Sequence, residues 1–389
     1  MARAETFQGY RRPDGRVGVR NHLAILPSVI CSSTVGQRIT ELVPGAVTTI
    51  HQYGCGQLGP DADLFVRTMV GTGSNPNVGA VIVVGLGCET AEAPLIAEGI
   101  AKTGKPVELI VIQEAGGSIR TIQEGAQMAQ KLQAKLSTMQ REEFPLSELV
   151  LATECGGSDT TSGLSSNPVV GVVSDMLVEA GGTVMISEAA EFIGAEHIFA
   201  QRAREPEIGE QLLAVVRKAE EDALNMGVDI RGANPAPGNI QGGLTTIEEK
   251  SLGCIYKGGT TVLEEVIGYA DYPSKKGLVV MDTPGYDSES VTGMIAGGAQ
   301  ICIFTTGRGS PLGNPVAPVI KVCANPQTVE KMQDNIDFSG VPVLDGTASI
   351  RELGEQLFDL TINTVNGLLT ATEILGHREF APHRIGPTM

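Results

Sequence analysis

With 389 residues, 42% of them hydrophobic and only 4% aromatic, the chain has enough apolar side chains for two cores, since single cores stop growing at roughly 250–300 residues. Its formal net charge of −17 argues against nucleic acid or an anionic membrane as a partner, although a local basic pocket would still admit a small anionic substrate. No apolar run predicts a membrane helix or a signal peptide, so we expect a cytoplasmic protein whose seven cysteines are free thiols or metal ligands.

Strands and helices alternate through the first part of the chain. We predict strands at 22–27, 46–50, 79–84 and 107–112, and helices at 31–43, 61–70, 91–101 and 118–141. Residues 79–84, GAVIVV, form a near-continuous apolar run, as in a strand buried on both faces. This alternation predicts a parallel sheet built from βα units.

A polar stretch at 140–145 is interpreted as a linker, after which the alternation starts again. Further strands are predicted at 148–152, 183–187, 278–282, 300–305 and 319–323, and further helices at 169–179, 204–227, from 291, and at 350–369. The chain is therefore predicted to be α/β, with two Rossmann-like halves and mainly parallel sheets. We place the domains at 1–145 and 146–389, with the active site at the carboxyl ends of the strands.

A short helix bordered by glycines is predicted within residues 238–259, GNIQGGLTTIEEKSLGCIYKGG. Thr245 has the position of an N-cap, and Glu248 follows at the capping-box spacing. The apolar positions are Ile247, Leu252 and Ile255. Because flanking glycines allow close backbone approach to a ligand, we interpret the segment as ligand-facing; the alternative is a solvated helix with flexible ends. Lys257 is then a candidate general base or carboxylate ligand, against the alternative of a solvated surface lysine.

Four cysteines share one position, each following a predicted strand within a few residues: Cys31, Cys55, Cys88 and Cys155. Carboxyl ends of parallel strands line one crevice, and the last three of these cysteines have glycine neighbours that leave room for an inorganic centre. His51, Glu89 and Glu154 lie close to them in the sequence, and thiolate, imidazole and carboxylate together suit iron or zinc. We predict Cys55, Cys88 and Cys155 as metal ligands; the alternative is that each is a small buried hydrophobe. Cys302 and Cys323 are predicted to be core residues, and Cys254 is left unassigned.

A second, basic and glycine-rich constellation follows the strand at 300–305. It consists of Thr305, Thr306, Gly307, Arg308, Gly309 and Ser310. Backbone amides, hydroxyls and a guanidinium are the groups of an oxyanion cradle, although the Walker pattern is absent. Lys321 in the next strand adds a possible cation. Arg308 and Lys321 are therefore predicted as catalytic residues beside Lys257, and Thr305, Thr306, Gly307 and Ser310 as substrate-binding residues.

Seven motifs together resemble one known enzyme family. GYRRPDGRVGVRNH, HQYGCG, GLGCE, TECGGSD, GGLTTIEEKSLG, DTPGYD and FTTGRGS, which span residues 7–321, are similar to the large-chain motifs of altronate/galactarate dehydratases. The resemblance implies an iron-dependent lyase acting on a small anionic 2-hydroxy acid, with Fe²⁺ or an iron–sulfur cluster as cofactor. Longer members carry a small additional N-terminal domain. Since this chain begins at GYRRPDG, it resembles two-subunit members in which a separate small chain supplies that domain, and we expect a hetero-oligomer.

The resemblance implies an elimination. A base removes the proton α to the carboxylate, and loss of the β-substituent gives an enol that becomes a 2-keto acid. HQYGCGQ and the chain length favour the branch that splits (2R)-3-sulfolactate into pyruvate and sulfite. Two alternatives stay open: a sugar-acid dehydratase, and a non-catalytic subunit that binds small anionic metabolites.

Overall fold

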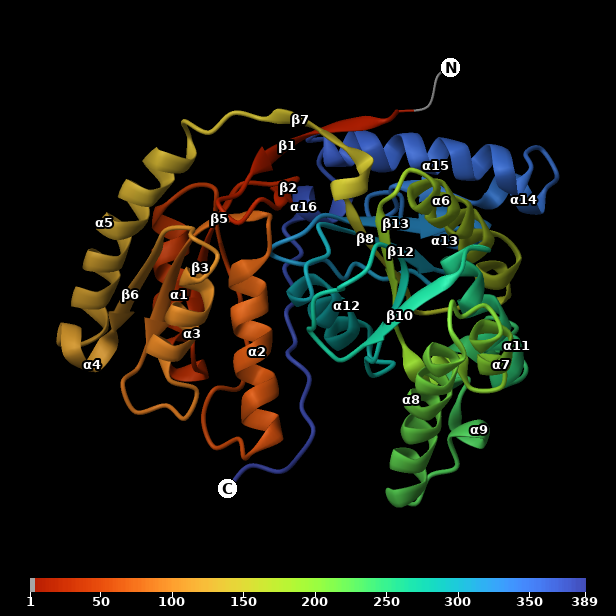
Figure 1. The fold of residues 1–389 in the computed structure, drawn as a ribbon, viewed down its shortest axis with the longest axis horizontal. Coiled ribbons are helices and arrows are strands. Elements are labelled where there is room, and N and C mark those ends of the chain that lie inside the picture. Colours follow the sequence, from red (N-terminus) through yellow and green to blue (C-terminus); the bar gives the residue numbers. More distant parts are fainter. Residues whose placement is uncertain (1–3) are drawn as a thin grey trace.

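The computed structural model describes residues 4–389, and its first part contains a four-stranded parallel sheet (Figure 1). The strand order is β4-β3-β5-β6, formed by β4 (Ala46–Thr48), β3 (His22–Pro27), β5 (Val78–Gly85) and β6 (Val107–Val111). Helices α1 (Ile30–Leu42) and α5 (Ser118–Leu136) cover one face, and α2 (Pro60–Ser74) and α3 (Ala93–Ala101) the other. All eight residues of β5 are buried, as its apolar run predicts.

The second part contains a seven-stranded sheet that is parallel throughout. Its order is β10-β11-β9-β8-β12-β13-β14, formed by β10 (Leu263–Ile267), β11 (Gly277–Met281), β9 (Thr183–Ile186), β8 (Val150–Cys155), β12 (Ile301–Thr306), β13 (Val319–Cys323) and β14 (Phe338–Ser339). Helices α6 (Asn167–Glu179), α8 (Pro206–Asn225) and α15 (Ile350–Val365) pack on one face, and α12 (Asp287–Ala296) on the other. The predicted α/β class with parallel sheets is confirmed.

A small antiparallel sheet joins the two parts, and the sequence analysis missed it. Strand β1 (Thr6–Arg11) pairs with β2 (Val17–Gly18) and with β7 (Glu142–Pro145). Four of the six residues 140–145, which we interpret as a linker, form strand β7, so this connection is an ordered strand. These strands carry few apolar residues, and the buried pair Phe7 and Phe144, with ring centroids 6.1 Å apart, holds β1 to β7. Such a weak apolar signal does not distinguish a short strand from a loop.

The remaining helices are short and lie mainly around the carboxyl edges of the sheets. They are α4 (Ile112–Ala115), α7 (Glu196–Ala200), α9 (Ile230–Ala233), α10 (Pro237–Gln241), α11 (Ile247–Ile255), α13 (Pro326–Lys331), α14 (Val341–Leu344) and α16 (Ala371–Leu375). Over residues 4–389, no helix combines the length and the apolar character needed to cross a bilayer. The domain boundary that we place after residue 145 stays a prediction.

The two parallel sheets share one hydrophobic core. Side chains from α2 pack with side chains from α12, and Figure 1 shows the two helices side by side at the centre of the molecule. Two buried asparagines between α2 and β5 reinforce this seam: Asn75 Nδ2 donates to the carbonyls of Ile295 and Ala299 at 2.8 and 2.9 Å. Asn77 Nδ2 donates to the carbonyls of Gln300 and Val316. The relative placement of the sheets is thus fixed by both apolar packing and directed hydrogen bonds.

Replacing Asn77 with alanine should destabilise the fold. The side chain is fully buried and its Oδ1 also accepts from the Val19 amide at 2.8 Å, so the substitution leaves several buried backbone groups unpaired. We expect the free energy of unfolding to fall by about 2–4 kcal/mol. Urea denaturation measures this, with Asn225→Ala, an exposed asparagine at the end of α8, as the control. If both variants have the same free energy of unfolding, the hydrogen bonds of Asn77 do not stabilise the contact between the two sheets.

Candidate active site

Polar side chains gather where β8, β9 and β12 end. Glu154 and Cys155 are the last residues of β8, and Glu188 follows β9 by two residues. Lys257 reaches the same place from the 3₁₀ turn Tyr256–Gly258, directly after α11. We call Glu154, Glu188, Glu191, Lys250 and Lys257 the lysine–carboxylate centre. It lies at the carboxyl edge of the parallel sheet, as the fold class predicts for a ligand site.

The innermost contact of the centre is the ion pair of Lys257 and Glu188, both of which are completely buried. Burial opposes the charged form of Lys257, but Cys254 and the carboxyl groups of Glu188 and Glu154 outweigh this effect and raise the pKa of Lys257 well above its ordinary value. Glu188 has a backbone φ of 73°, which is uncommon for a residue other than glycine. Such local strain is found at functional sites that hold a side chain in place.

Glu154 shares the charge of Lys257 with Glu188. Its Oε2 accepts hydrogen bonds from Ser290 Oγ at 2.6 Å and Ser187 Oγ at 3.1 Å, while its buried Oε1 has no partner within the described residues. Burial raises the pKa of Glu154 to about 7, although the nearby Lys257 counteracts this. A carboxyl group that titrates near neutral pH can both accept and release a proton.

A second lysine–carboxylate pair borders a small cleft. Lys250 Nζ lies 2.6 Å from Glu191 Oε1, with 10% and 7% of the side chains exposed. Lys250, Cys155, Ser158 and Asn167 line the cleft, and Cys155 Sγ lies 2.8 Å from Ser158 Oγ. The cleft therefore offers a cation, a thiol, a hydroxyl and an amide next to the ion pair.

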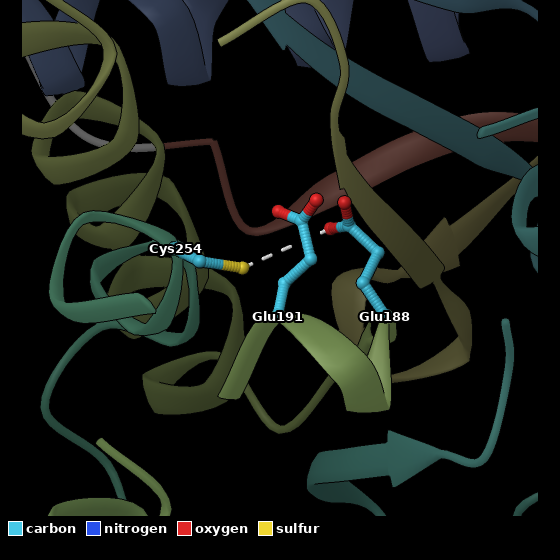
Figure 2. Close-up of side chains that lie close together, drawn as sticks. All are labelled: Glu188, Glu191 and Cys254. Carbon is cyan, nitrogen blue, oxygen red and sulfur yellow. Dashed lines mark hydrogen bonds between the residues drawn. The ribbon is translucent and has the colours of Figure 1, made fainter. Parts of the chain in front are cut away.

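Three donor groups of this region are arranged as they would be around a metal ion. Within residues 4–389, the one group of three acidic, histidine or cysteine side chains whose donor atoms lie within 4.8 Å of one another consists of Glu188, Glu191 and Cys254. Figure 2 shows the two carboxylates on the segment after β9 and the thiol on α11 pointing toward one another. Glu188 Oε1 and Glu191 Oε2 are buried and have no hydrogen-bond partner. Two carboxylates and a thiol suit Fe²⁺ or Zn²⁺, so the residues present fit a divalent cation.

The formal charge of the lysine–carboxylate centre is also compatible with a bound divalent cation. With every group ionised, three carboxylates and two lysines sum to −1, and a divalent cation would change this to +1. Burial and the neighbouring Glu154 raise the pKa of Glu188 well above its ordinary value, so a proton held by these carboxyl groups makes the centre more positive still. A small dianion would then enter a site of opposite charge.

Two known protein domains match nearly the whole of the described chain. Residues 9–137 match the second domain of D-galactarate dehydratase/altronate hydrolase, and residues 146–388 match the C-terminal domain of D-galactarate/altronate dehydratase. The chain belongs to the galactarate/altronate dehydratase family.

Individual relatives agree with this assignment. The chain is 41% identical to the (2R)-sulfolactate sulfo-lyase subunit beta of Chromohalobacter salexigens, over 98% of both chains. It is 37% identical to the galactarate dehydratase (L-threo-forming) of Escherichia coli, over 93% of this chain and 73% of that one. It is 32% identical to the altronate dehydratase of Bacillus subtilis, over 99% and 78%. The prediction of an enzyme of the lyase class is confirmed.

In this dehydratase-family chain, Lys257 lies close enough to Cys155 to affect its pKa, and Lys257 is not the solvated surface lysine of the alternative reading. Lys257 is paired with Glu188 rather than solvated, and its raised pKa makes it a fixed cation or proton donor rather than a base. Lys321 is also fully buried, in β13, and its Nζ lies 3.3 Å from the centroid of the Phe304 ring with no hydrogen-bond partner. Burial lowers the pKa of Lys321 to about 7.

Several groups of the predicted oxyanion cradle already have hydrogen-bond partners within the protein. Thr305 Oγ1 donates to Asn167 Oδ1 at 2.6 Å, and Thr306 Oγ1 accepts from the Gly309 amide. The amides of Gly307 and Arg308 donate to the Gly157 carbonyl. Ser310 Oγ lies 3.4 Å from the Leu312 amide, and the exposed Arg308 has Gln241 Oε1 at 3.5 Å. The substrate-binding roles of these residues stay predictions.

The cysteines predicted as metal ligands lie in different parts of the fold. Cys55 and Cys88 are exposed beside the four-stranded sheet, whereas Cys155 is buried at the end of β8. They do not form a group within 4.8 Å among the described residues. Both ring nitrogens of His51 already have backbone partners, with Nε2 2.8 Å from the Pro27 carbonyl and Nδ1 accepting from the Tyr53 amide. The ligand assignment stays a prediction, and the structure does not assemble it.

Helix α11 confirms part of the prediction for residues 238–259. The N-cap is Thr246 rather than Thr245, because Thr246 Oγ1 accepts from the Glu249 amide, while the Thr245 hydroxyl bonds the Glu249 carboxylate. Ile247 and Ile255 are buried as predicted, but Leu252 is 41% exposed.

Glu188 and Glu191 were missed in the sequence analysis. Their signal is the run SEAAEF directly after a predicted strand, which places two carboxylates three residues apart at the carboxyl edge. Spacing alone does not reveal that α11, some sixty residues later, supplies their partners.

The stability of the metal-free protein should depend on pH through Glu154. The unfolded carboxyl loses its proton near its ordinary pKa of 4.5, whereas the folded one keeps it until about pH 7, so the free energy of unfolding should fall as pH rises through this window. The slope contributed by one group is at most about 1.4 kcal/mol per pH unit. Urea denaturation between pH 4.5 and 8, with a chelator present, compares wild type with Glu154→Gln, which should lack this contribution. Parallel profiles of the two proteins would rule it out.

Proposed function

We propose that this chain is the catalytic subunit of a lyase that converts (2R)-3-sulfolactate to pyruvate and sulfite. The strongest support is the 41% identity to a sulfolactate sulfo-lyase beta subunit over 98% of both chains, which is higher than the 37% and 32% identities to the sugar-acid dehydratases and covers more of the relative than the 73% and 78% of those two enzymes. The buried lysine–carboxylate centre supplies the groups that such an elimination requires.

Glu154 is the proposed base. Its unpartnered Oε1 and a pKa of about 7 allow it to take the proton from C2 of the substrate at neutral pH. The electron pair of the C2–H bond forms the C2=C3 double bond, and the C3–S bond breaks with its electron pair going to sulfur. The products are sulfite and an enol, which loses its O–H proton and takes a proton at C3 to become pyruvate. Lys257, charged and adjacent, is the proposed proton donor or counter-charge for the enediolate-like intermediate.

Cations around the centre are proposed to hold the two anionic ends of the substrate. Lys250 lines the cleft, and Lys321 is a buried amine with no hydrogen-bond partner among the described residues. A metal ion held by Glu188, Glu191 and Cys254 would act as a Lewis acid that polarises the substrate carboxylate and hydroxyl. We propose iron as that metal.

Substrate entry is proposed to need movement of the glycine-rich segment 238–259. All five side chains of the centre are buried or nearly so, and α11 with the turn that follows it carries both lysines. Gly243 and Gly259 have positive φ values of 96° and 62°, which lets the chain reverse on either side of α11. A closed site would exclude water from the enol and the carbanion-like intermediate.

We further propose a small partner subunit and a hetero-oligomer. The relative with the higher identity is named a beta subunit, a name that implies a second kind of chain in that enzyme.

A sugar-acid dehydratase is the second candidate function. It is supported by the galactarate and altronate dehydratase relatives, and by Lys257, because hydroxide is a poor leaving group that needs a proton donor. A non-catalytic anion-binding subunit is the third. One assay separates them, with the chain tested together with its small partner. Sulfite released from sulfolactate supports the first, a 2-keto-3-deoxy acid formed from altronate or galactarate supports the second, and binding without turnover supports the third.

Glu154→Gln should lower kcat strongly. The variant keeps the shape and the hydrogen-bond acceptor but cannot take a proton, so we expect a loss of about 10²–10⁴-fold. Glu148→Gln is the matched control, because Glu148 is an exposed glutamate that pairs with Lys276. Steady-state kinetics of both variants gives the comparison, and near-wild-type kcat in Glu154→Gln would remove it as the base.

Arg308→Lys should weaken substrate selection. Lysine keeps the charge but loses the planar fork that pairs with carboxylate or sulfonate, so kcat/KM should fall by about tenfold or more while bound iron stays unchanged. Arg38→Lys, on an exposed arginine paired with Glu41 in α1, is the control. If Arg308→Lys and Arg38→Lys both behave like wild type, Arg308 is a solvated loop residue.

A further inference from the structure

Three cysteines are exposed, and all three lie at the same edge of the four-stranded sheet. Cys31 is in the first turn of α1 after β3, Cys55 is in the loop after β4, and Cys88 follows β5. The other four cysteines are buried. Since a free cysteine is usually a buried residue, three exposed thiols on adjacent loops are an unusual arrangement.

Backbone hydrogen bonds tie the three loops together. The Ile30 amide donates to the Tyr53 carbonyl at 2.9 Å, and the Ala91 amide donates to the Gly54 carbonyl at 3.0 Å. Gly54 has a φ of 101°, and a Cβ there would lie 2.2 Å from the Ser28 carbonyl oxygen, so this loop rests directly on the end of β3. The residues that flank Cys31, Cys55 and Cys88 are thereby in mutual contact.

A buried carboxylate fixes the third loop against the first. Glu89 Oε1 accepts from Ser28 Oγ at 2.6 Å, and Glu89 Oε2 accepts from the Gly87 amide at 2.6 Å. These two hydrogen bonds fix the loop that carries Cys88 against the end of β3.

Hydrogen bonds hold two of the three sulfur atoms in place. Thr90 Oγ1 donates to Cys55 Sγ at 3.7 Å, and Gln113 Nε2 donates to Cys88 Sγ at 3.5 Å. Cys31 lies in the first turn of α1, a 13-residue helix. Each of the three sulfur atoms is therefore carried by an ordered segment at this edge of the sheet.

We propose that Cys31, Cys55 and Cys88 bind an iron–sulfur cluster of the [4Fe–4S] type. A single metal ion fits poorly, because ligands at 2.3 Å from a tetrahedral ion lie about 4 Å apart, and these sulfurs are not a trio within 4.8 Å among the described residues. A cluster of four irons spans a wider set of thiolates, and three cysteines leave one iron without a protein thiolate. This site is separate from Glu188, Glu191 and Cys254 and does not depend on the proposed substrate.

Anaerobic reconstitution with ferric iron, sulfide and an excess of a thiol reductant, which reduces half of the iron to the ferrous state, tests the site in the full chain. Wild type should hold about four iron and four acid-labile sulfide ions and show the visible absorption of a cluster. Single Cys31→Ser, Cys55→Ser and Cys88→Ser variants should hold less of both, and the triple variant almost none. Cys155→Ser, the remaining thiol at a strand end, and Glu154→Gln should keep full cluster content. A triple variant with wild-type iron and sulfide overturns the proposal, as does iron without sulfide that a chelator removes, which is an adventitious ion only.

Thiol labelling provides a test that uses no variant. In the apo protein, a maleimide should modify these three cysteines rapidly and the four buried cysteines slowly. After reconstitution the three should be protected, which peptide mass spectrometry measures site by site. Equal labelling rates before and after reconstitution would overturn the proposal.

Discussion

The withdrawal of the Lys257–Glu188 ion pair from water is the constraint on which the rest of the site depends. Removing two charges from solvent costs several kcal/mol per ion, which only close contact and further polar partners offset. The negative charge of Glu154 also favours charged Lys257, and Glu154 is held in place by the hydroxyls of Ser187 and Ser290. The charge must be buried at the carboxyl edge because helices cover both faces of the sheet. Function and fold thus depend on the same few contacts.

The fold was predictable because its apolar periodicity is strong. Strands such as β5 and β11 are buried along their whole length and leave continuous apolar runs, and the long helices keep one apolar face. The antiparallel strands β1, β2 and β7 were not predictable, because a single buried phenylalanine in β1 or β7 gives no period. Their pairing is determined by contacts between segments more than a hundred residues apart.

Only part of the candidate site was predictable, because it too depends on contacts between segments far apart in the sequence. Local pattern identified Lys257, Cys155 and the loop Glu154 belongs to, since each sits next to glycines or a strand end. It did not identify that Lys257 meets Glu188, because no sequence spacing encodes a contact between a loop after β9 and a turn after α11. Strand-end position also placed all the cysteines at one crevice, whereas the chain builds two sheets, and each has its own carboxyl edge.

The backbone and the side chain at position 188 favour different amino acids. A φ of 73° suits glycine, and asparagine or aspartate is the next best choice, yet it is the longer carboxylate of glutamate that contacts Lys257 here. Most substitutions at position 188 that relax the backbone therefore leave Lys257 buried without its carboxylate partner. Glutamate keeps that partner together with the backbone strain. A single substitution at position 188 therefore loses either the favourable backbone or the ion pair. A shift to another residue requires a simultaneous change at position 257, so the two positions are expected to vary as a pair or not at all.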